Sequence, residues 1–401
     1  MNIPSKKIIF YIVSVFCVTV ITFFALPAQE KNNDLDTTTP TDPKVELKAK
    51  NPIQVEYYPI ETTKKVHLKL DSLLQRIHKR HDFHGAVLVA KNNKIVYQNQ
   101  VGYADFRKRA PLEETSIFQL ASVSKQFTAA AIMHLKEQGK IKLSDTVNQY
   151  FPKFPYKHIT IKNLLQHTAG LPKYFWIAEH EWEKEKAPTN IDLIKVLPSS
   201  KARRYFRPGL KFDYSNTGYF VLASIVENVS GLSFSSYLKE HFFDPLGMKN
   251  TFVYRFQVDS IRKNQLIGYR IYRGWRHIKI RGTVNDAIVG DKNVYSTTKD
   301  LFKWSYALNS GKVLSKESVK QMYTRGKTKY GRKIPYGFGF RINSANEQKI
   351  YHYGKWNGFS TSLTNYLDDN LVVIVLEHTC YNSLKYINRK IKKIVTDYLN
   401  V

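Results

Sequence analysis

The chain has 401 residues, which allows one large domain or two ordinary ones with enough chain to bury a core. Hydrophobic residues make up 43% and aromatic residues 13%, which excludes a wholly disordered protein. The formal net charge is +29, but the lysines and arginines are spread along the chain. The densest basic runs, 201–204 and 389–393, have no nucleic-acid-binding motif around them, so we expect a generally basic surface and no nucleic-acid partner.

The first segment of the chain carries targeting information. Lys6 and Lys7 precede an uncharged apolar run of 19 residues, 8–26, which is just long enough to span a bilayer as a helix. Positive charges on its short N-terminal side predict that the rest of the chain is translocated. We expect residues 1–28 to be a signal anchor or, with cleavage after Ala28, a signal peptide, with the anchor slightly favoured. The protein is then extracytoplasmic, either periplasmic or extracellular, and tethered to the cell envelope.

A polar spacer precedes the folded part of the chain. Residues 29–62 contain threonine and proline and show no apolar period. Apolar residues then recur at helical spacing over 66–83, which predicts an amphipathic helix. Residues 85–105 alternate around the turn residues Asn92 and Asn93, which predicts a β-hairpin.

The remaining pattern predicts a two-part domain over residues 63–401. The middle, 116–255, has a mostly helical pattern, 351–379 has the pattern strand, turn, strand, and an amphipathic helix is predicted over 383–400. We therefore expect an α/β (α+β) fold in which an antiparallel sheet is flanked by N- and C-terminal helices and joined by a mostly helical lobe. The active site is expected in the cleft between the two parts.

The cysteines exclude an internal disulfide in the body of the protein. Cys17 lies inside the apolar run, so Cys380 is the single thiol that remains. No metal site can be built from cysteine here, and we expect no metal and no cofactor.

The first motif with chemical meaning is Ser122 followed by Lys125, at the start of a strongly helical run. Residues three apart share a helix face, so the lysine amine can reach the serine hydroxyl. Lysine can activate a serine if burial or nearby positive charge lowers its pKa, and the helix N-terminus offers N–H groups to a developing oxyanion. Spacing alone does not distinguish this pair from three chance matches in a lysine-rich chain, which are Ser236/Lys239, Ser260/Lys263 and Ser296/Lys299.

The second motif is Tyr214-Ser215-Asn216, which follows the turn at 208–209 and precedes a helix predicted over about 218–229. A phenol near a lysine ammonium is expected to have a lowered pKa, so Tyr214 can serve as general base and return the proton to a leaving group. The amide of Asn216 can bind both a substrate carbonyl and the lysine. The alternative is a buried tyrosine and a helix-capping asparagine.

The third motif is His352-Tyr353-Gly354, on the strand predicted near the C-terminus. Glycine on a strand allows a ligand to approach the backbone closely. The backbone N–H of Lys355 is expected to complete an oxyanion hole with that of Ser122. A structural histidine with satisfied hydrogen bonds is the alternative for His352.

Taken in this order, the three motifs resemble the signature boxes of the β-lactamase-like serine hydrolases, a superfamily that includes class C β-lactamases, D-Ala-D-Ala carboxypeptidases and related esterases. The resemblance covers about residues 66–401 and implies that Ser122 is the acylated nucleophile and that Lys125 and Tyr214 form the acid/base pair. By the same resemblance Asn216 binds substrate and His352 lines the opposite wall. Four further segments support it: 164–172, 208–219, 243–254 and 294–304.

Two residues depart from the superfamily pattern. His352 stands where β-lactamases typically carry lysine, which predicts weaker or pH-dependent anchoring of a substrate carboxylate. Asn293 stands where relatives often have glycine, and this change is expected to be neutral because asparagine tolerates the left-handed conformation. His167 is interpreted as structural, at the end of a helix before Gly170.

The hypothesis is a serine hydrolase that works through an acyl-enzyme intermediate on amide, ester or peptidoglycan-type peptide substrates outside the cytoplasm. One alternative is a penicillin-binding sensory or binding module that acylates without turnover, and another is an anionic-polymer-binding protein. The set Ser122, Lys125 and Tyr214 favours the hydrolase, because a sensor need not keep the base that drives turnover. Expected partners are a small-molecule or peptide substrate and the membrane, with no obligate protein partner.

Overall fold

The computed structural model describes residues 52–182 and 185–399. The chain divides into two units, 1–43 and 44–401, and every described residue belongs to the second unit. The predicted signal segment and the spacer up to residue 51 lie outside the described residues. Over the part that the structure describes, no helix combines the length and the apolar character needed to cross a bilayer.

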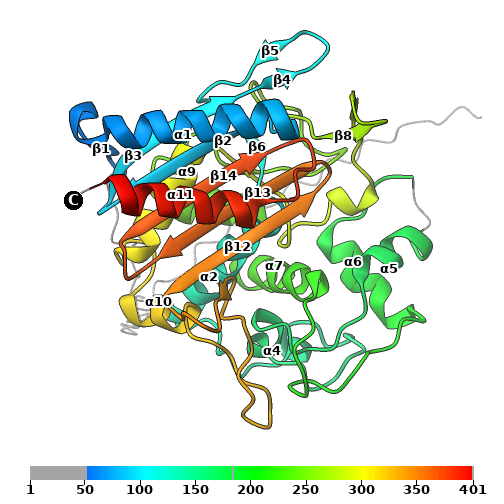
Figure 1. Cartoon of the computed structure of the whole chain (residues 1–401). Helices are drawn as coiled ribbons and strands as arrows, with labels where there is room; N and C mark the ends of the chain where they lie inside the picture. The colour runs from blue at the N-terminus through cyan, green and yellow to red at the C-terminus, as the bar shows by residue number, and fades with distance from the viewer. Residues whose placement is uncertain (1–51, 183–184, 400–401) are drawn as a thin grey trace, which may run out of the picture. The chain divides into compact units, whose positions relative to one another are not determined.

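A seven-stranded sheet forms the centre of the described fold, in the order β1-β3-β2-β14-β13-β12-β11 (Figure 1). All neighbouring strands are antiparallel except β1 and β3. Strands from the two ends of the chain meet where β2 pairs with β14, which confirms the antiparallel sheet predicted from both ends. The strands are β1 (Glu56–Tyr57), β2 (Gly85–Lys91), β3 (Lys94–Val101), β11 (Arg341–Ile342), β12 (Lys349–Trp356), β13 (Phe359–Tyr366) and β14 (Leu371–Glu377).

The two predicted hairpins close with turn residues that accept a positive φ. Asn92 and Asn93 have φ of 47° and 65° between β2 and β3, and Asn357 and Gly358 have φ of 44° and 89° between β12 and β13. Positive φ at both central residues gives a turn whose twist matches the strands, and asparagine and glycine tolerate it best. Both hairpin predictions are therefore confirmed.

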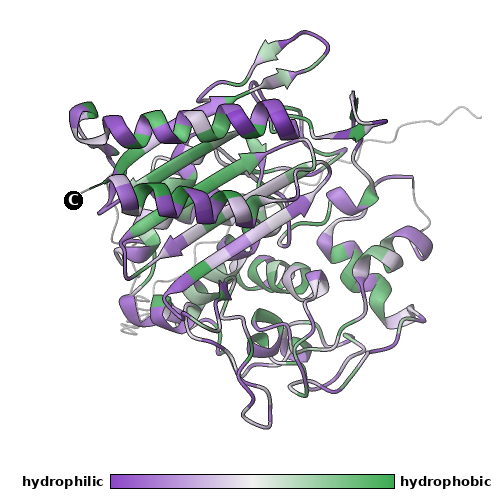
Figure 2. Ribbon diagram, viewed as in Figure 1, coloured by the Kyte–Doolittle hydropathy of each residue, from purple (hydrophilic) through white to green (hydrophobic). Residues whose placement is uncertain are grey.

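Two amphipathic helices, α1 (Ile60–His81) and α11 (Leu384–Tyr398), lie across one face of the sheet (Figure 1). Their apolar sides pack with β2, β3 and β14 into one hydrophobic cluster, and Figure 2 shows their hydrophilic residues on the outer side. Both predicted terminal helices are confirmed. Helix α1 begins at Ile60, before the predicted start at Val66, so the end of the predicted spacer belongs to the folded part.

A larger cluster fills the space between the other sheet face and the helical lobe. Helix α9 (Thr298–Asn309) packs on that face, and α2 (Lys125–Glu137) runs on from the 3-10 turn η1 (Ala121–Ser124), which contacts β12. The predicted helical lobe is confirmed, in short helices joined by loops. Its elements are α3 (Val147–Tyr150), α4 (Ile161–Leu165), α5 (Tyr174–His180), α6 (Asn190–Val196), η2 (Leu197–Ser199), α7 (Asn216–Ser230), α8 (Phe234–Leu238) and the π-helical turn η3 (Lys239–Phe243), with α10 (Lys316–Met322) later in the chain.

Several short strands were not predicted from the sequence. They form a three-stranded sheet in the order β6-β10-β7 and two small hairpins, β4-β5 and β8-β9. Runs of two to four residues are too short to show a periodic pattern, so their pairing is set by the tertiary fold. Their bounds are β4 (Tyr103–Asp105), β5 (Ala110–Pro111), β6 (Phe118–Gln119), β7 (Phe252–Val253), β8 (Tyr269–Tyr272), β9 (Arg276–Lys279) and β10 (Val294–Ser296), and a 3-10 turn, η4 (Val284–Asp286), precedes β10.

Helix α7 is the central helix of the lobe and contacts α2, α4, α6 and α8. It begins at Asn216, two residues before the predicted start, and ends at Ser230, where Gly231 adopts φ 71°. Gly218 faces α4 so closely that a Cβ there would lie 3.2 Å from the carbonyl oxygen of Leu164. This packing places the second motif beside the start of α2, where the first motif lies.

Candidate active site

The turn that carries Ser122 is held from two sides. The Thr361 hydroxyl donates a 2.6 Å hydrogen bond to the Leu120 carbonyl, and the Leu120 N–H donates a 2.8 Å bond to the Val294 carbonyl. Between these bonds Ala121 adopts φ 48°, a conformation that residues other than glycine rarely adopt. Such backbone strain persists where the surroundings fix it and is frequent at functional sites.

Lys125, the first residue of α2, is completely buried beside Ser122. Its Nζ donates a 3.2 Å hydrogen bond to the Ser122 Oγ and a 2.7 Å bond to the main-chain carbonyl of Asp291. Burial lowers the pKa of Lys125 to about 7, although the Asp291 charge opposes this effect and the Arg341 charge adds to it. The predicted contact between the lysine and the serine is therefore present, with the lysine in an environment that disfavours its charged form.

Tyr214 lies just before α7, and its ring centroid is 5.1 Å from the Lys125 Nζ. The prediction that the lysine lowers the phenol's pKa is wrong. Burial raises the pKa of Tyr214 above its usual value, and the opposing effects of Ser122 and Arg341 are smaller. The reason is that burial disfavours the charged phenolate more strongly than the neighbouring groups favour it.

Asn216, the first residue of α7, carries an unpaired side-chain oxygen. Its side-chain Oδ1 is buried and has no hydrogen-bond partner among the described residues. The predicted contact with Lys125 does not form, because that amine is bound to Ser122 and Asp291. The free Oδ1 is able to accept an N–H from a bound molecule.

Strand β12 lies directly against the nucleophile turn. A Cβ at Gly354 would lie 2.3 Å from the Leu120 carbonyl oxygen and 3.0 Å from the Ala121 Cβ, so only glycine permits this approach. The sequence predicted that Gly354 allows a ligand to approach the backbone closely, whereas in the structure it is the backbone at Leu120 that approaches it. The next residue, Lys355, hydrogen-bonds through its side chain to Asn382.

His352 is buried on β12 with both ring nitrogens engaged. Its Nδ1 lies 2.8 Å from the Tyr353 carbonyl, which only accepts, so Nδ1 carries the hydrogen and Nε2 accepts from the Tyr336 hydroxyl at 2.9 Å. Burial, followed by the charges of Lys125 and Arg341, lowers the pKa of His352 well below its usual value. The histidine is therefore neutral near pH 7, where it offers no positive charge to the substrate carboxylate whose anchoring was predicted to be weaker or pH-dependent.

Arg341 is a charged residue of this site that the sequence did not indicate. Its guanidinium lies 4.8 Å from the centroid of the Tyr214 ring, and no described acidic side chain forms an ion pair with it. It lies on β11, opposite Tyr351 of β12. Only this strand pairing brings it to the site, so no local motif signals it.

His167 is buried against the second motif, as its structural interpretation requires. Its ring centroid lies 4.3 Å from that of Tyr214, and its Nδ1 accepts a 3.1 Å hydrogen bond from the Ser215 N–H. Burial lowers the pKa of His167 well below its usual value. The histidine thus holds the loop before α7 in place.

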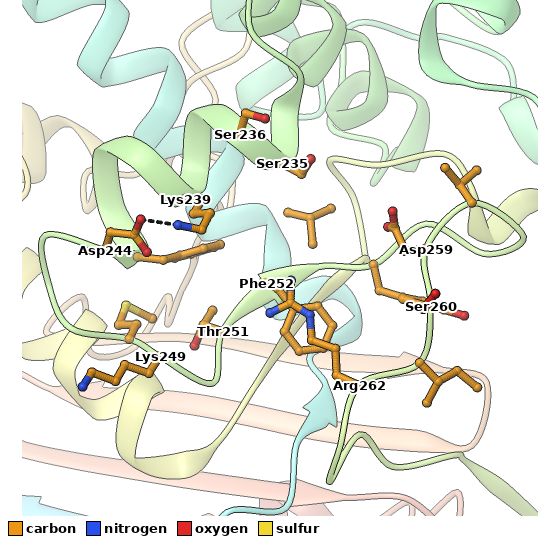
Figure 3. Close-up of a pocket in the computed structure, with 16 residues that line it drawn as sticks. Ser235, Ser236, Lys239, Asp244, Lys249, Thr251, Phe252, Asp259, Ser260 and Arg262 are labelled. Atoms are coloured by element: carbon orange, nitrogen blue, oxygen red, sulfur yellow. Dashed lines mark hydrogen bonds and ion pairs between the residues drawn. The ribbon is translucent and has the colours of Figure 1, made fainter.

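In none of the three chance Ser-x-x-Lys matches does the lysine amine hydrogen-bond to the serine hydroxyl in the described chain. Ser236, Lys239 and Ser260 line a separate pocket of about 540 Å³, and Figure 3 shows the Lys239 amine directed at Asp244. Ser296 hydrogen-bonds to Thr251, while Lys299 pairs with Glu114. Among the four Ser-x-x-Lys pairs, Ser122 is therefore the serine whose hydroxyl is hydrogen-bonded to its own lysine amine in the described residues.

One cluster of potential metal ligands occurs in the described residues, formed by Asp82, His84 and His277. The Tyr103 N–H donates to the Nδ1 of His84, so the hydrogen of this neutral ring sits on Nε2 and is donated to Asp82. A metal would need the lone pair of that same Nε2, with Nδ1 donating to an acceptor. The cluster is therefore built as a hydrogen-bond network and does not fit a metal ion.

Comparison with known proteins agrees with this geometry. Residues 70–395 match the family described as Beta-lactamase. Penicillin-binding protein 4* of Bacillus subtilis (strain 168) is 34% identical over 320 residues, which cover 77% of this chain and 71% of that protein. The B. subtilis protein PbpX is 28% identical over 395 residues, or 97% and 94% of the two chains. The structure of D-amino acid amidase from Ochrobactrum anthropi SV3 with D-phenylalanine matches with a TM-score of 0.68 at 19% identity, covering 84% of this chain and 99% of that one.

Proposed function

The chain belongs to the β-lactamase family of serine hydrolases, and on that premise we propose that it cleaves amide, ester or peptidoglycan-type peptide substrates through an acyl-enzyme on Ser122. One observation carries the proposal. The buried Lys125 amine lies 3.2 Å from the Ser122 hydroxyl, and its pKa of about 7 leaves a large neutral fraction at neutral pH. A neutral amine at this distance is a competent general base for a serine nucleophile.

The proposed reaction assigns the two proton carriers separately. Neutral Lys125 takes the proton from Ser122 as its oxygen bonds to the substrate carbonyl carbon, and the backbone N–H groups of Ser122 and Lys355 bind the oxyanion. Tyr214, whose pKa is raised, stays protonated and donates to the leaving group as the scissile bond breaks. Water then attacks the acyl-enzyme and gives a proton to the Tyr214 phenolate, and the Lys125 ammonium returns its proton to the departing Ser122 oxygen.

For the substrate we propose a molecule with an N–H and a negative charge near the scissile bond. Asn216 offers an unpaired acceptor, and Arg341 offers a cation without an acidic partner among the described residues. The neutral His352 lines the wall beside them. Penicillin-binding and amidase names among the relatives support amides of this kind.

A second candidate is a module that acylates without turnover. The observation in its favour is that the Tyr214 hydroxyl and the Asn216 Oδ1 are both buried, which restricts the entry of hydrolytic water. The two candidates differ only in the fate of the acyl-enzyme.

Intact-protein mass spectrometry after exposure to a penicillin and to a fluorophosphonate tests both candidates. An adduct on Ser122 that decays supports the hydrolase, and a penicillin adduct that persists supports the binding module. No adduct with either reagent, in protein shown to be folded by circular dichroism, would contradict the assignment of Ser122.

We also propose that residues 29–401 lie outside the cytoplasm, tethered by the segment 1–28. Support comes from Lys6 and Lys7 before the uncharged run, and from the penicillin-binding relatives. Protease added to intact spheroplasts is expected to digest the domain, with a cytoplasmic enzyme as the protected control. Complete protection of the domain would refute this location.

A further inference from the structure

A second buried lysine, Lys292, lies close to the catalytic one. Its side chain is 3% exposed, and its Nζ donates hydrogen bonds to the Tyr174 hydroxyl at 2.5 Å and to the Asn285 carbonyl at 2.7 Å. The same Nζ lies 3.3 Å from Oδ1 of the neighbouring Asp291. The hydrogen bonds of the Lys292 Nζ thus all go to oxygen atoms, and none of them goes to Ser122.

Asp291 connects the two lysines through different atoms. Its main-chain carbonyl accepts from Lys125, while its fully buried carboxylate accepts from the Tyr174 hydroxyl at 3.1 and 3.2 Å and from Lys292. The carboxylate is therefore held away from Ser122 and shared between a phenol and an ammonium. Such a group is costly to bury without a cationic partner.

The charges of this network act directly on the base. Burial lowers the pKa of Lys125, and the Asp291 carboxylate opposes this effect. Burial also lowers the pKa of Lys292, the charges of Asp291 and Asp286 oppose it, and the charge of Lys125 adds a smaller lowering effect. Electrostatic coupling between two sites is reciprocal, so a charged Lys292 also favours the neutral form of Lys125. The Asp291 carboxylate and the Lys292 ammonium thus have opposite effects on the pKa of Lys125.

We propose that Lys292 is a positioning residue: by pairing with the Asp291 carboxylate, directly and through Tyr174, it cancels the negative charge that would otherwise hold a proton on Lys125. This inference rests on the proposed role of Lys125 as general base. Lys292 touches neither substrate nor nucleophile and acts through the protonation state of another residue. The titratable and charged groups that face or couple to Lys125 are Tyr214, Tyr219, Asp291, Lys292, Arg341, His167 and His352.

The test is the pH profile of Ser122 labelling by a fluorophosphonate in the full-length chain, followed by peptide mass spectrometry from pH 5 to 9. Lys292→Met leaves the Asp291 charge unopposed, so the pH of half-maximal labelling rate is expected to rise by about one unit or more. Asp291→Asn removes that charge and should move the midpoint down. The double variant should return it towards the wild-type value, because the two changes cancel.

A matched control is Lys303→Met. Lys303 also pairs with a buried carboxylate, Asp300, with side chains 16% and 4% exposed, but in α9 and without an interaction with Lys125. The pH of half-maximal Ser122 labelling in Lys303→Met should match that of the wild type. A variant that fails to fold is recognised by circular dichroism, and Lys292→Gln, which removes the charge but keeps a polar side chain, then replaces Lys292→Met.

The outcomes separate this inference from the proposed function. Absence of labelling in the wild-type protein contradicts the proposed function itself. Labelling of Ser122 with an unmoved midpoint in folded Lys292→Met and Asp291→Asn overturns the role of Lys292, even if the rate falls equally at every pH. Opposite shifts in the two single variants establish it.

Discussion

The Ser122/Lys125 and Ser236/Lys239 pairs share one spacing at the start of a helical segment and differ in their surroundings. Lys125 is 0% exposed and donates to Ser122, whereas the side chain of Lys239 is 65% exposed and pairs with Asp244. An exposed ion pair of this kind contributes at most about 1 kcal/mol. Spacing therefore determines which atoms can meet, and burial determines whether the amine can accept a proton.

The burial of Lys125 is produced by elements distant in the sequence. The rings of Tyr214 and Tyr219, from the loop before α7 and from α7 itself, lie 5.1 and 5.6 Å from its Nζ. The Asp291 carbonyl covers it from a third segment. Lys239 has no comparable cover, because its side chain is mostly exposed and its amine is directed at Asp244 at the edge of the pocket (Figure 3).

The largest expected effect separates the two serines. Ser122→Ala should abolish covalent labelling by a fluorophosphonate, because the attacking oxygen is removed. Ser236→Ala should label as the wild type does. Peptide mapping of the adduct measures both. Labelling at Ser236, Ser260 or Ser296 that survives Ser122→Ala would contradict the assignment of Ser122 as the nucleophile.

Removing the two lysines is the next test. Lys125→Ala should reduce kcat on an active ester by about 100- to 10,000-fold, the usual range for loss of a general base. Lys239→Ala should leave kcat unchanged, because its amine contacts Asp244 and not the serine. Steady-state kinetics measure kcat of both variants, with thermal melts as a folding control. Equal losses of kcat in the two variants would show that the burial of the lysine does not determine its role in catalysis.

Tyr214→Phe removes the hydroxyl and keeps the ring beside Lys125. We expect kcat to fall roughly a hundredfold, with little change in ground-state affinity, because the proton donor to the leaving group is lost. The double variant with Lys125→Ala should be much less impaired than the product of the single effects, as expected for residues that act as a unit. If Tyr214→Phe keeps most of the wild-type kcat while acylation stays on Ser122, the phenol does not handle the proton.

The pH dependence of kcat/KM also distinguishes the two lysines, with a smaller expected effect than the substitutions. A base must be neutral to work, so kcat/KM should rise with pH through about 7, the pKa of Lys125, and gain about tenfold per unit below it. Lys239→Ala should leave this limb in place. A limb near the ordinary pKa of lysine would mean that burial does not lower the pKa of Lys125.

The sequence predicted those parts of the site whose signal is local. Alternation around Asn92 and Asn93 and the strand, turn, strand pattern of 351–379 predict the sheet, and helical periodicity predicts the two terminal helices. Ser122 is distinguished from the other serines because two later motifs follow it in the resembled order. Arg341 could not be found in this way, because it reaches Tyr214 only through the pairing of β11 with β12. Asp291 and Lys292 are likewise brought to Lys125 by tertiary packing.

The sign of the Tyr214 pKa shift shows the limit of reasoning from neighbours alone. The sequence correctly predicted a lysine near the phenol, and a cation by itself favours phenolate. The sequence did not show how deeply both groups are buried, and desolvation acts on the phenol and on the amine together. For this reason the proposed general base is Lys125 and not Tyr214.

The smallest expected effect concerns His352, which is buried as Lys125 is but does not contact Ser122. Its two ring nitrogens are bound to Tyr353 and Tyr336, so it has no free lone pair with which to take a proton. His352→Ala should lower kcat less than tenfold on a small neutral ester and mainly change the preference among larger substrates, because a wall of the site is lost. Ratios of kcat/KM across a substrate series, with Ser236→Ala as the unaffected control, measure this. A loss as large as that of Lys125→Ala would place His352 in the proton-transfer step, and burial together with contact to Ser122 would no longer identify the base.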